Sequence, residues 1–197
     1  QITGRTVNLI DLTAQAPTSY RVRTRRPEET TTVVLHQTGF AWKPSNPMWA
    51  KVRSHYVVRR DGSVLLLHRP ETRMRYGSSV ANRYCVSIEH EGNYANASGS
   101  WWKPEKYGAH HPTPELIAAS RDLLTMLHES YPSILYVSAH RHIQAVKSNC
   151  CGPELWQALG CWAIAELGLR EAPVLAGGKA LPAAWWGSGG VEACCAV

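Results

Sequence analysis

The stretch SHYVVRRDGSVLLLHRP, residues 54–70, holds two short apolar runs on either side of an Asp61-Gly62 pair. Both runs, YVV and VLLL, consist of apolar residues, and the β-branched and aromatic ones among them favour strands. An Asp-Gly pair favours the tight turns that match the twist of two antiparallel strands. The stretch therefore predicts a β-hairpin with a two-residue turn. The hairpin also contains many arginines, and it has a histidine near each end, His55 and His68. The role of these residues depends on the rest of the chain.

Three further strands are predicted from short apolar or β-branched runs bounded by turn residues. Each places an ionisable side chain at or just beyond the end of the strand, where it can reach a cleft. The runs are TTVVLH (31–36), which ends at His36, YCVSIEH (84–90), which contains Glu89, and SILYVS (133–138), which His140 follows at a short distance.

Two helices are predicted in the second half of the chain. The first starts at Pro114, after a threonine that can act as N-cap, and it ends before Pro132. The second starts at Pro153 and stops at Gly168, because glycine readily adopts the left-handed conformation that ends a helix. Together with the strands, these helices indicate an α/β domain.

The length of 197 residues fits one main domain. Residues 1–30 show little periodicity, and we expect them to form an arm packed on the domain. The domain itself is expected at residues 31–170. The composition then shifts to Ala, Gly, Pro and Trp, so residues 171–197 are interpreted as a tail or linker whose Trp185-Trp186 pair offers a docking element.

The formal net charge of +6 favours an anionic partner such as nucleic acid, an acidic membrane surface or a bacterial wall polymer. Solvated surface charge explains the same composition equally well. No stretch approaches the roughly 18 apolar residues of a membrane span, and the N-terminus lacks the pattern of a signal peptide, so we expect no span. The six cysteines lack the spacing of a disulfide framework, which leaves the redox compartment open.

His36, His140 and Cys150 are the candidate metal ligands. Zinc binds imidazole nitrogen and thiolate sulfur, and a catalytic zinc keeps three protein ligands and one open position. Two histidines at strand ends and a cysteine just before a helix can converge at one edge of a sheet. The spacing alone fits structural histidines as well. His142 and Cys151 remain competing ligands, because each lies within two residues of a candidate.

From about residue 31 to 168, the chain resembles the zinc-dependent N-acetylmuramoyl-L-alanine amidases, a family that includes phage amidase lysozymes, cell-wall recycling amidases and peptidoglycan recognition proteins. The resemblance implies a central mixed β-sheet flanked by helices, with a zinc site in a cleft at the sheet edge. It is carried by motifs in the family's order: VVLHQTG, HYVVRRDGSVLLLHRP, VSIEHEGNY, TPELIAASRDLLTML, VSAHRH and CCGPELW.

The resemblance also implies roles for individual residues. His36, His140 and Cys150 would bind Zn²⁺, Glu89 matches a strand glutamate that acts as general base, and Lys147 is the candidate that stabilises the oxyanion. The implied reaction is hydrolysis of the amide bond between the lactyl group of N-acetylmuramic acid and L-alanine of the stem peptide. The implied partner is therefore peptidoglycan or its soluble muropeptides.

Contacts with the substrate are expected at His55 and Asn82, and at Trp101 and Trp102 through stacking on sugar faces. Arginines in and around the hairpin offer cations to the carboxylates of muropeptides or to an anionic wall polymer. These arginines are Arg53, Arg59, Arg60, Arg69, Arg73 and Arg75.

The chain departs from the family pattern at a few positions. Lys147 precedes the third ligand by three residues rather than two, and Tyr76 stands near the position of a family histidine. Cys151 replaces a proline, and a disulfide with the preceding cysteine is an alternative that would remove the thiolate. Ser54 replaces the tyrosine that one branch uses for catalysis, which favours Glu89 as the base.

Two other classes of function compete with the amidase. A peptidoglycan-binding recognition module would keep the fold without catalysis, and the presence of Cys150 argues against it. A basic nucleic-acid-binding domain lacks support, because both predicted helices carry few cations. We expect a monomer that acts on the cell wall, and therefore a secreted, periplasmic or phage-delivered protein, in wall remodelling, recycling or lysis.

Overall fold

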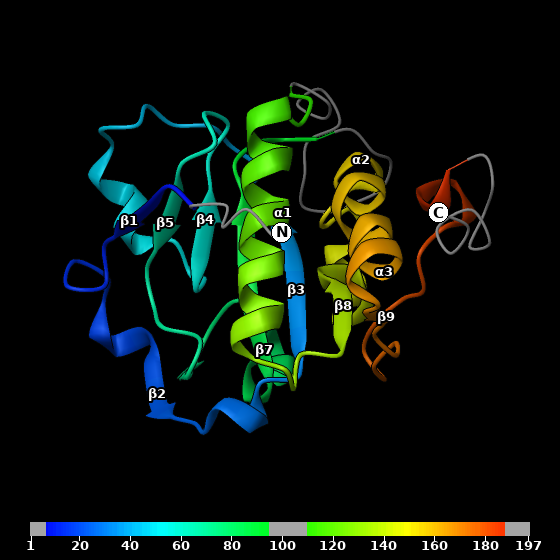
Figure 1. Ribbon diagram of the computed structural model, residues 1–197, viewed down its shortest axis with the longest axis horizontal. Coiled ribbons are helices and arrows are strands. Elements are labelled where there is room, and N and C mark those ends of the chain that lie inside the picture. The colour runs from blue at the N-terminus through cyan, green and yellow to red at the C-terminus, as the bar shows by residue number, and fades with distance from the viewer. Residues whose placement is uncertain (1–6, 95–109, 188–197) are drawn as a thin grey trace, which may run out of the picture.

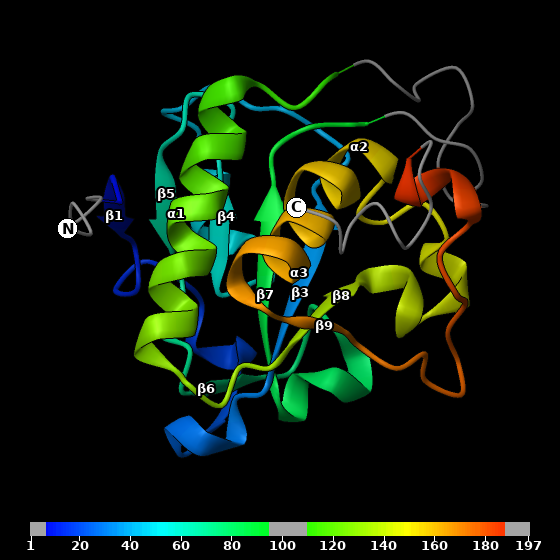
Figure 2. The ribbon, with the colours of Figure 1, turned by 45° about the vertical axis from the view of Figure 1, so that its right-hand side comes forward.

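The computed structural model describes residues 7–94 and 110–187 (Figures 1 and 2). In this part of the chain the main sheet has seven strands in the order β1-β5-β4-β7-β3-β8-β9, and β2 and β6 form a separate pair. The strands are β1 (Leu9–Asp11), β2 (Arg21–Thr24), β3 (Thr32–Gln37), β4 (Tyr56–Val58), β5 (Val64–Leu66), β6 (Thr72–Met74), β7 (Cys85–His90), β8 (Tyr136–Ala139) and β9 (Arg170–Glu171).

The centre of the sheet is parallel. Strand β3 pairs in parallel with β7 on one side and with β8 on the other, and β4 pairs in parallel with β7. The hairpin strands β4 and β5 pair antiparallel, and β1 pairs in parallel with β5. Strands β1 and β5 therefore run opposite to the other five strands of this sheet. The predicted mixed sheet is confirmed, and so are the five predicted strands, to within a few residues.

Two helical elements cover one face of the sheet (Figures 1 and 2). The first is α1 (Pro114–Ser130), and its predicted N-cap is present because Thr113 Oγ1 accepts a hydrogen bond from Leu116 N at 3.2 Å. The second runs without a break through α2 (Pro153–Leu155), a π-helical segment (Trp156–Cys161) and α3 (Trp162–Leu167). It ends at Gly168 in the left-handed conformation, as predicted.

Side chains alternate between the two faces of the sheet, so the two faces carry different residues. Val33 and Leu35 of β3 belong to the large core that contains the buried leucines of α1. Val34, on the other face, belongs to a small cluster with Cys85. His36 shares the face of Val34, since side chains two apart on a strand point the same way. The face away from α1 is therefore the one that carries His36.

The hairpin differs from its prediction in one detail. Its turn holds three residues, Arg60, Asp61 and Gly62, because Arg59 N donates to Ser63 O at 2.9 Å. Gly62 N also donates to the Arg59 carbonyl at 3.0 Å, and Gly62 has φ of 81°. The glycine therefore takes the left-handed position of a three-residue loop rather than a place in a two-residue turn.

Both flanking segments contact the domain. Strand β1 adds an edge to the sheet, and β2 pairs with β6. At the other end, β9 adds the opposite edge, while Trp185 and Trp186 are 1% and 8% exposed. The division at residues 30 and 170 stays a prediction. Among the described residues, no helix has the length and apolar character needed to cross a membrane.

Candidate active site

The register of the parallel strands brings the predicted site residues together. His36 of β3 lies beside Glu89 of β7, and Leu35 lies beside Ala139 of β8, so His140 follows directly at the level of His36. Parallel strands end at the same edge of a sheet, and residues in register point to the same face. Three side chains from distant parts of the sequence therefore meet at one edge.

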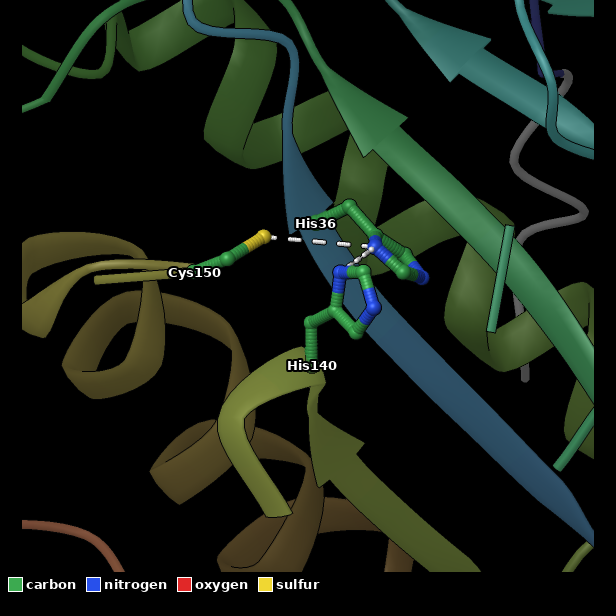
Figure 3. Close-up of side chains that lie close together, drawn as sticks. All are labelled: His36, His140 and Cys150. Carbon is green, nitrogen blue, oxygen red and sulfur yellow. Dashed lines mark hydrogen bonds between the residues drawn. The ribbon is translucent and has the colours of Figure 1, made fainter. Parts of the chain in front are cut away.

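Cys150 completes the group from the segment that precedes α2. Figure 3 shows His36, His140 and Cys150 pointing toward one another. The two Nδ1 atoms of the histidines are 2.9 Å apart, and the Cys150 Sγ lies 3.9 Å from His36 Nδ1. The three ligand atoms all lie within 4.8 Å of one another, and all three residues are buried. This is the group that the sequence predicts as metal ligands.

Two of the three ligand-to-ligand distances are close to those of a tetrahedral metal centre. Bond lengths and angles typical of zinc separate two nitrogen ligands by roughly 3.3 Å, and a nitrogen and a sulfur ligand by roughly 3.6 Å. The observed 2.9 Å and 3.9 Å lie on either side of these values. A metal ion held by these three residues alone would keep one position open, which is the arrangement of catalytic rather than structural zinc sites.

Hydrogen bonds on the outer nitrogens support the same interpretation. His140 Nε2 faces the Gln144 Oε1 acceptor at 3.0 Å, so Nε2 carries the proton and Nδ1 presents its lone pair. His36 Nε2 lies 3.0 Å from Ser78 Oγ, which in turn contacts Ser87 Oγ at 2.7 Å. If Ser78 donates to Ser87, it accepts from His36. Two lone pairs then face each other at 2.9 Å, and a cation between them relieves the repulsion.

Burial sets the charge of the three groups. It lowers the pKa of His36 well below its usual value and the pKa of His140 to about 3, so both imidazoles are neutral, the form that binds metals. Burial, followed by the nearby Glu89 carboxylate, raises the pKa of the Cys150 thiol. A metal cation therefore has to displace that proton, which couples metal binding to proton release.

The two competing ligands point elsewhere. Cys151 belongs to the large core, and its Sγ lies 3.7 Å from the Gly152 carbonyl oxygen. Both Cys150 and Cys151 are free thiols, whereas Cys161 is disulfide-bonded. His142 Nε2 lies 3.0 Å from Glu171 Oε1, and its Nδ1 lies 3.3 Å from Ser138 Oγ. The thiol that lies in the group with the two histidines is thus that of Cys150, and His142 pairs with Glu171 instead.

Glu89 stands beside the ligand group with one carboxylate oxygen unengaged. Its Oε1 is 3.9 Å from His36 Nδ1, and its Oε2 is buried without a hydrogen-bond partner among the described residues. Burial raises the pKa of Glu89 to about 7, although the positive charge of Lys147 opposes the shift. A carboxyl group with such a pKa exchanges protons readily near neutral pH, as a general base must.

A cleft of about 360 Å³ opens over this group. Glu89 and Lys147 line it, and so do two exposed arginines, Arg53 and Arg75. The Arg53 guanidinium lies 4.4 Å from the ring centroid of Tyr76, which also lines the cleft. The cleft therefore presents three cations around one carboxylate and suits an anionic ligand.

Neither His55 nor Asn82 lines this cleft. His55 is fully buried, its Nδ1 accepts from Ser87 N at 3.0 Å and its Nε2 lies 2.8 Å from Thr72 O. Asn82 is 3% exposed, and its Oδ1 accepts from Ser78 N at 2.9 Å. His55 engages both ring nitrogens inside the protein, whereas Asn82 Nδ2 is buried without a hydrogen-bond partner among the described residues. Neither side chain reaches the cleft. The predicted contacts at residues 101 and 102, both tryptophans, lie outside the described residues.

His55 should instead make the fold sensitive to acid. Burial, with the charge of Arg25, lowers the pKa of His55 from 6.5 to about 3. The unfolded chain therefore binds more protons between these values, and stability falls as the pH drops from about 6.5 toward 3, by about 1.4 kcal/mol per pH unit. We expect denaturant unfolding to show a smaller loss of stability between about pH 7 and about pH 5 in His55→Gln than in the parent protein. Equal losses would contradict this assignment.

The sequence did not reveal the residues that support the ligands. Ser78 and Gln144 hold the two imidazoles, and Gln37 N donates to the Cys150 Sγ at 3.3 Å. Gln144 follows His140 by four residues, the spacing of neighbours on a helical turn, which is the one local signal available. Ser78 comes from a different segment, and only the fold brings it to His36.

The chain matches the N-acetylmuramoyl-L-alanine amidase family over residues 25–153. No curated protein sequence matches the chain significantly. Among solved structures, the endolysin amidase LysCS of Clostridium intestinale is similar with a TM-score of 0.60 and 14% identity, over 85% of this chain and 99% of that one.

Two other solved structures show the same fold. Peptidoglycan recognition protein SD of Drosophila has a TM-score of 0.57 and 16% identity, over 86% of this chain and 100% of that one. AmpD has a TM-score of 0.58 and 16% identity, over 80% of this chain and 95% of that one. The chain thus shares its fold with these three proteins. By its sequence, the chain belongs to the N-acetylmuramoyl-L-alanine amidase family.

Proposed function

We propose that this protein is a zinc-dependent amidase that hydrolyses the bond between N-acetylmuramic acid and L-alanine of the stem peptide. The observation that carries the proposal is the convergence of His36, His140 and Cys150 beside Glu89 at one edge of the sheet. A recognition module needs neither a thiol ligand nor a buried carboxylate next to the ligand group. The arrangement therefore favours catalysis over binding alone.

His36 Nδ1, His140 Nδ1 and Cys150 Sγ would hold the zinc ion. When bound, zinc supplies a Lewis acid that acidifies water and polarises the amide carbonyl. Ser78 and Gln144 keep the two imidazoles in the orientation and tautomer that the ion requires. The residues present thus match the zinc that the family resemblance implies.

Glu89 and Lys147 would do the proton transfer and the charge stabilisation. The free Glu89 Oε2 takes a proton from the attacking water and returns it to the leaving amine. Lys147 lines the same cleft, and its positive charge acts on Glu89, His140 and Cys150. Such a cation stabilises the negative oxygen that develops on the carbonyl during attack.

Arg53 and Arg75 would bind carboxylates of the stem peptide. Neither guanidinium has a carboxylate partner within the described part of the chain, and both line the cleft. We expect the double variant Arg53→Gln/Arg75→Gln to raise KM for muropeptides about 10-fold, because charged hydrogen bonds are lost, while kcat changes little. The exposed Arg83 lies outside the lining, so Arg83→Gln is the control. A double variant with the KM of the parent would contradict this role.

The products of digestion test the proposed function. Purified protein with one equivalent of zinc is incubated with intact sacculi and with soluble muropeptides, and the products are identified by mass spectrometry. We expect stem peptides with a free L-alanine amine, together with intact glycan. Binding to sacculi without any release of peptides would identify a recognition module instead. New reducing sugar ends would identify a glycosidase.

A further inference from the structure

We infer that the segment after β9, residues 172–187, is a positioning strap that holds the metal-ligand segment in place. The inference rests on the proposed zinc site, and it concerns residues beyond the part of the chain that matches the amidase family, which ends at residue 153. The strap is defined as residues 172–187. The ligand segment is residues 139–150, which runs from the end of β8 to Cys150.

The ligand segment has little regular structure of its own. It contains only two short 3-10 turns, His140–His142 and Ala145–Lys147. Neither turn is long enough to fix the positions of His140 and Cys150 relative to β3. The backbone of this segment must therefore be held from outside.

The strap supplies that support through backbone hydrogen bonds. It runs alongside the first half of the ligand segment and bonds to it in both directions. The bonds are Leu175 N to His142 O at 2.9 Å, Lys179 N to Arg141 O at 2.8 Å and Ala145 N to Gly177 O at 2.7 Å.

Arg141 links the strap to both ends of the ligand segment. Its Nε donates to Ala180 O of the strap at 2.9 Å, and its Nη1 donates to Ser148 O. Its backbone N donates to Cys150 O at 3.0 Å. The guanidinium also lies 5.4 Å from the ring centroid of Trp185. One residue, next in sequence to His140, thus connects the strap with the position of Cys150 through its side chain and its backbone.

The far end of the strap is anchored in the core. Trp185 and Trp186 are both buried, and the rings of Trp186 and Trp156 are 5.6 Å apart in an edge-on contact. The part of the strap that meets the ligand segment, residues 172–180, is exposed or half-buried. Moving that part should therefore disturb the ligands more than the core.

Two adjacent glycines provide a matched pair of variants. A Cβ added at Gly178 would lie 1.9 Å from His142 O and 2.4 Å from His142 C, so Gly178→Ala must displace the strap from the ligand segment. A Cβ at Gly177 would lie 3.6 Å from Ile143 O, an ordinary contact. Gly177→Ala makes the same chemical change one residue away and should leave the strap in place.

The test is zinc affinity, measured by competition with a chromophoric chelator, together with the absorption spectrum of the cobalt-substituted protein. We expect Gly178→Ala to bind zinc at least about 10-fold more weakly than the parent protein and to show a changed cobalt spectrum, since support of the ligands contributes to affinity. Gly177→Ala should match the parent in both. A change confined to unfolding stability, with parental affinity and spectrum, would overturn the proposal.

A second variant covers the case in which Gly178→Ala fails to fold. Arg141→Lys keeps the charge but replaces the two separate donor nitrogens that bond Ala180 O and Ser148 O by a single ammonium, so it should weaken zinc binding in the same direction. Parental affinity in Arg141→Lys would contradict the strap. If the parent protein itself binds no zinc, the proposed metal site fails and the strap fails with it, whereas a zinc-binding parent with unaffected variants overturns only the strap.

Discussion

Replacing Glu89 by glutamine is expected to lower kcat about 10³-fold while zinc binding persists. The amide keeps the size of the side chain but cannot accept the proton of the attacking water, and general bases typically contribute about 10²–10⁴-fold. Glu89 is not one of the three grouped ligands, so the metal should stay in place. The measurement is the release of stem peptides under saturating substrate, together with the zinc content of each sample.

Glu115→Gln serves as the control for this change. Glu115 is exposed in the first turn of α1 and plays no part in the cleft lining. Its substitution should leave both zinc content and activity at the level of the parent protein. A Glu89→Gln protein that keeps zinc and most of its activity would show that another group takes the proton.

Replacing Cys150 by serine is expected to lower zinc affinity by at least about 100-fold and to remove activity with it. Loss of groups that merely support a ligand costs about 10–100-fold in affinity, and loss of a ligand should cost more. Cys151→Ser is the matched comparison, because the two residues are adjacent and equally buried but only the Cys150 Sγ faces His36. Zinc content and activity are measured side by side under reducing conditions.

The Cys151 variant should behave differently. Its hydroxyl would enter the apolar core, which costs about 1–3 kcal/mol of stability, but zinc should still bind. If instead Cys151→Ser lost zinc and Cys150→Ser kept it, the assignment of the third ligand would be reversed. Equal zinc binding by both variants would mean that neither thiol is a ligand.

The elements that local patterns define were predictable from the sequence. Short β-branched runs marked the central strands, and the threonine N-cap and Gly168 marked the helix boundaries that the structure shows. The order of the motifs then suggested the family, which the comparison confirms. These predictions were correct because each one depends on residues that are close together in the chain.

Features that depend on tertiary contacts were not predictable. No pattern indicates whether Cys150 or Cys151 faces the histidines, because that depends on the path of the chain before α2. Likewise, the sequence predicts a substrate contact at His55, whereas in the fold its two ring nitrogens face Ser87 N and Thr72 O. The support of His36 by Ser78 arises only when two distant segments meet.

Titration of the metal-free protein with zinc shows whether hydrolysis depends on one bound ion. Amidase activity on a defined muropeptide is followed as zinc is added, and the bound metal is measured in each sample. We expect activity to rise in proportion to bound zinc and to stop rising at one ion per chain. Full activity without zinc, or one bound zinc without any hydrolysis, would contradict this expectation.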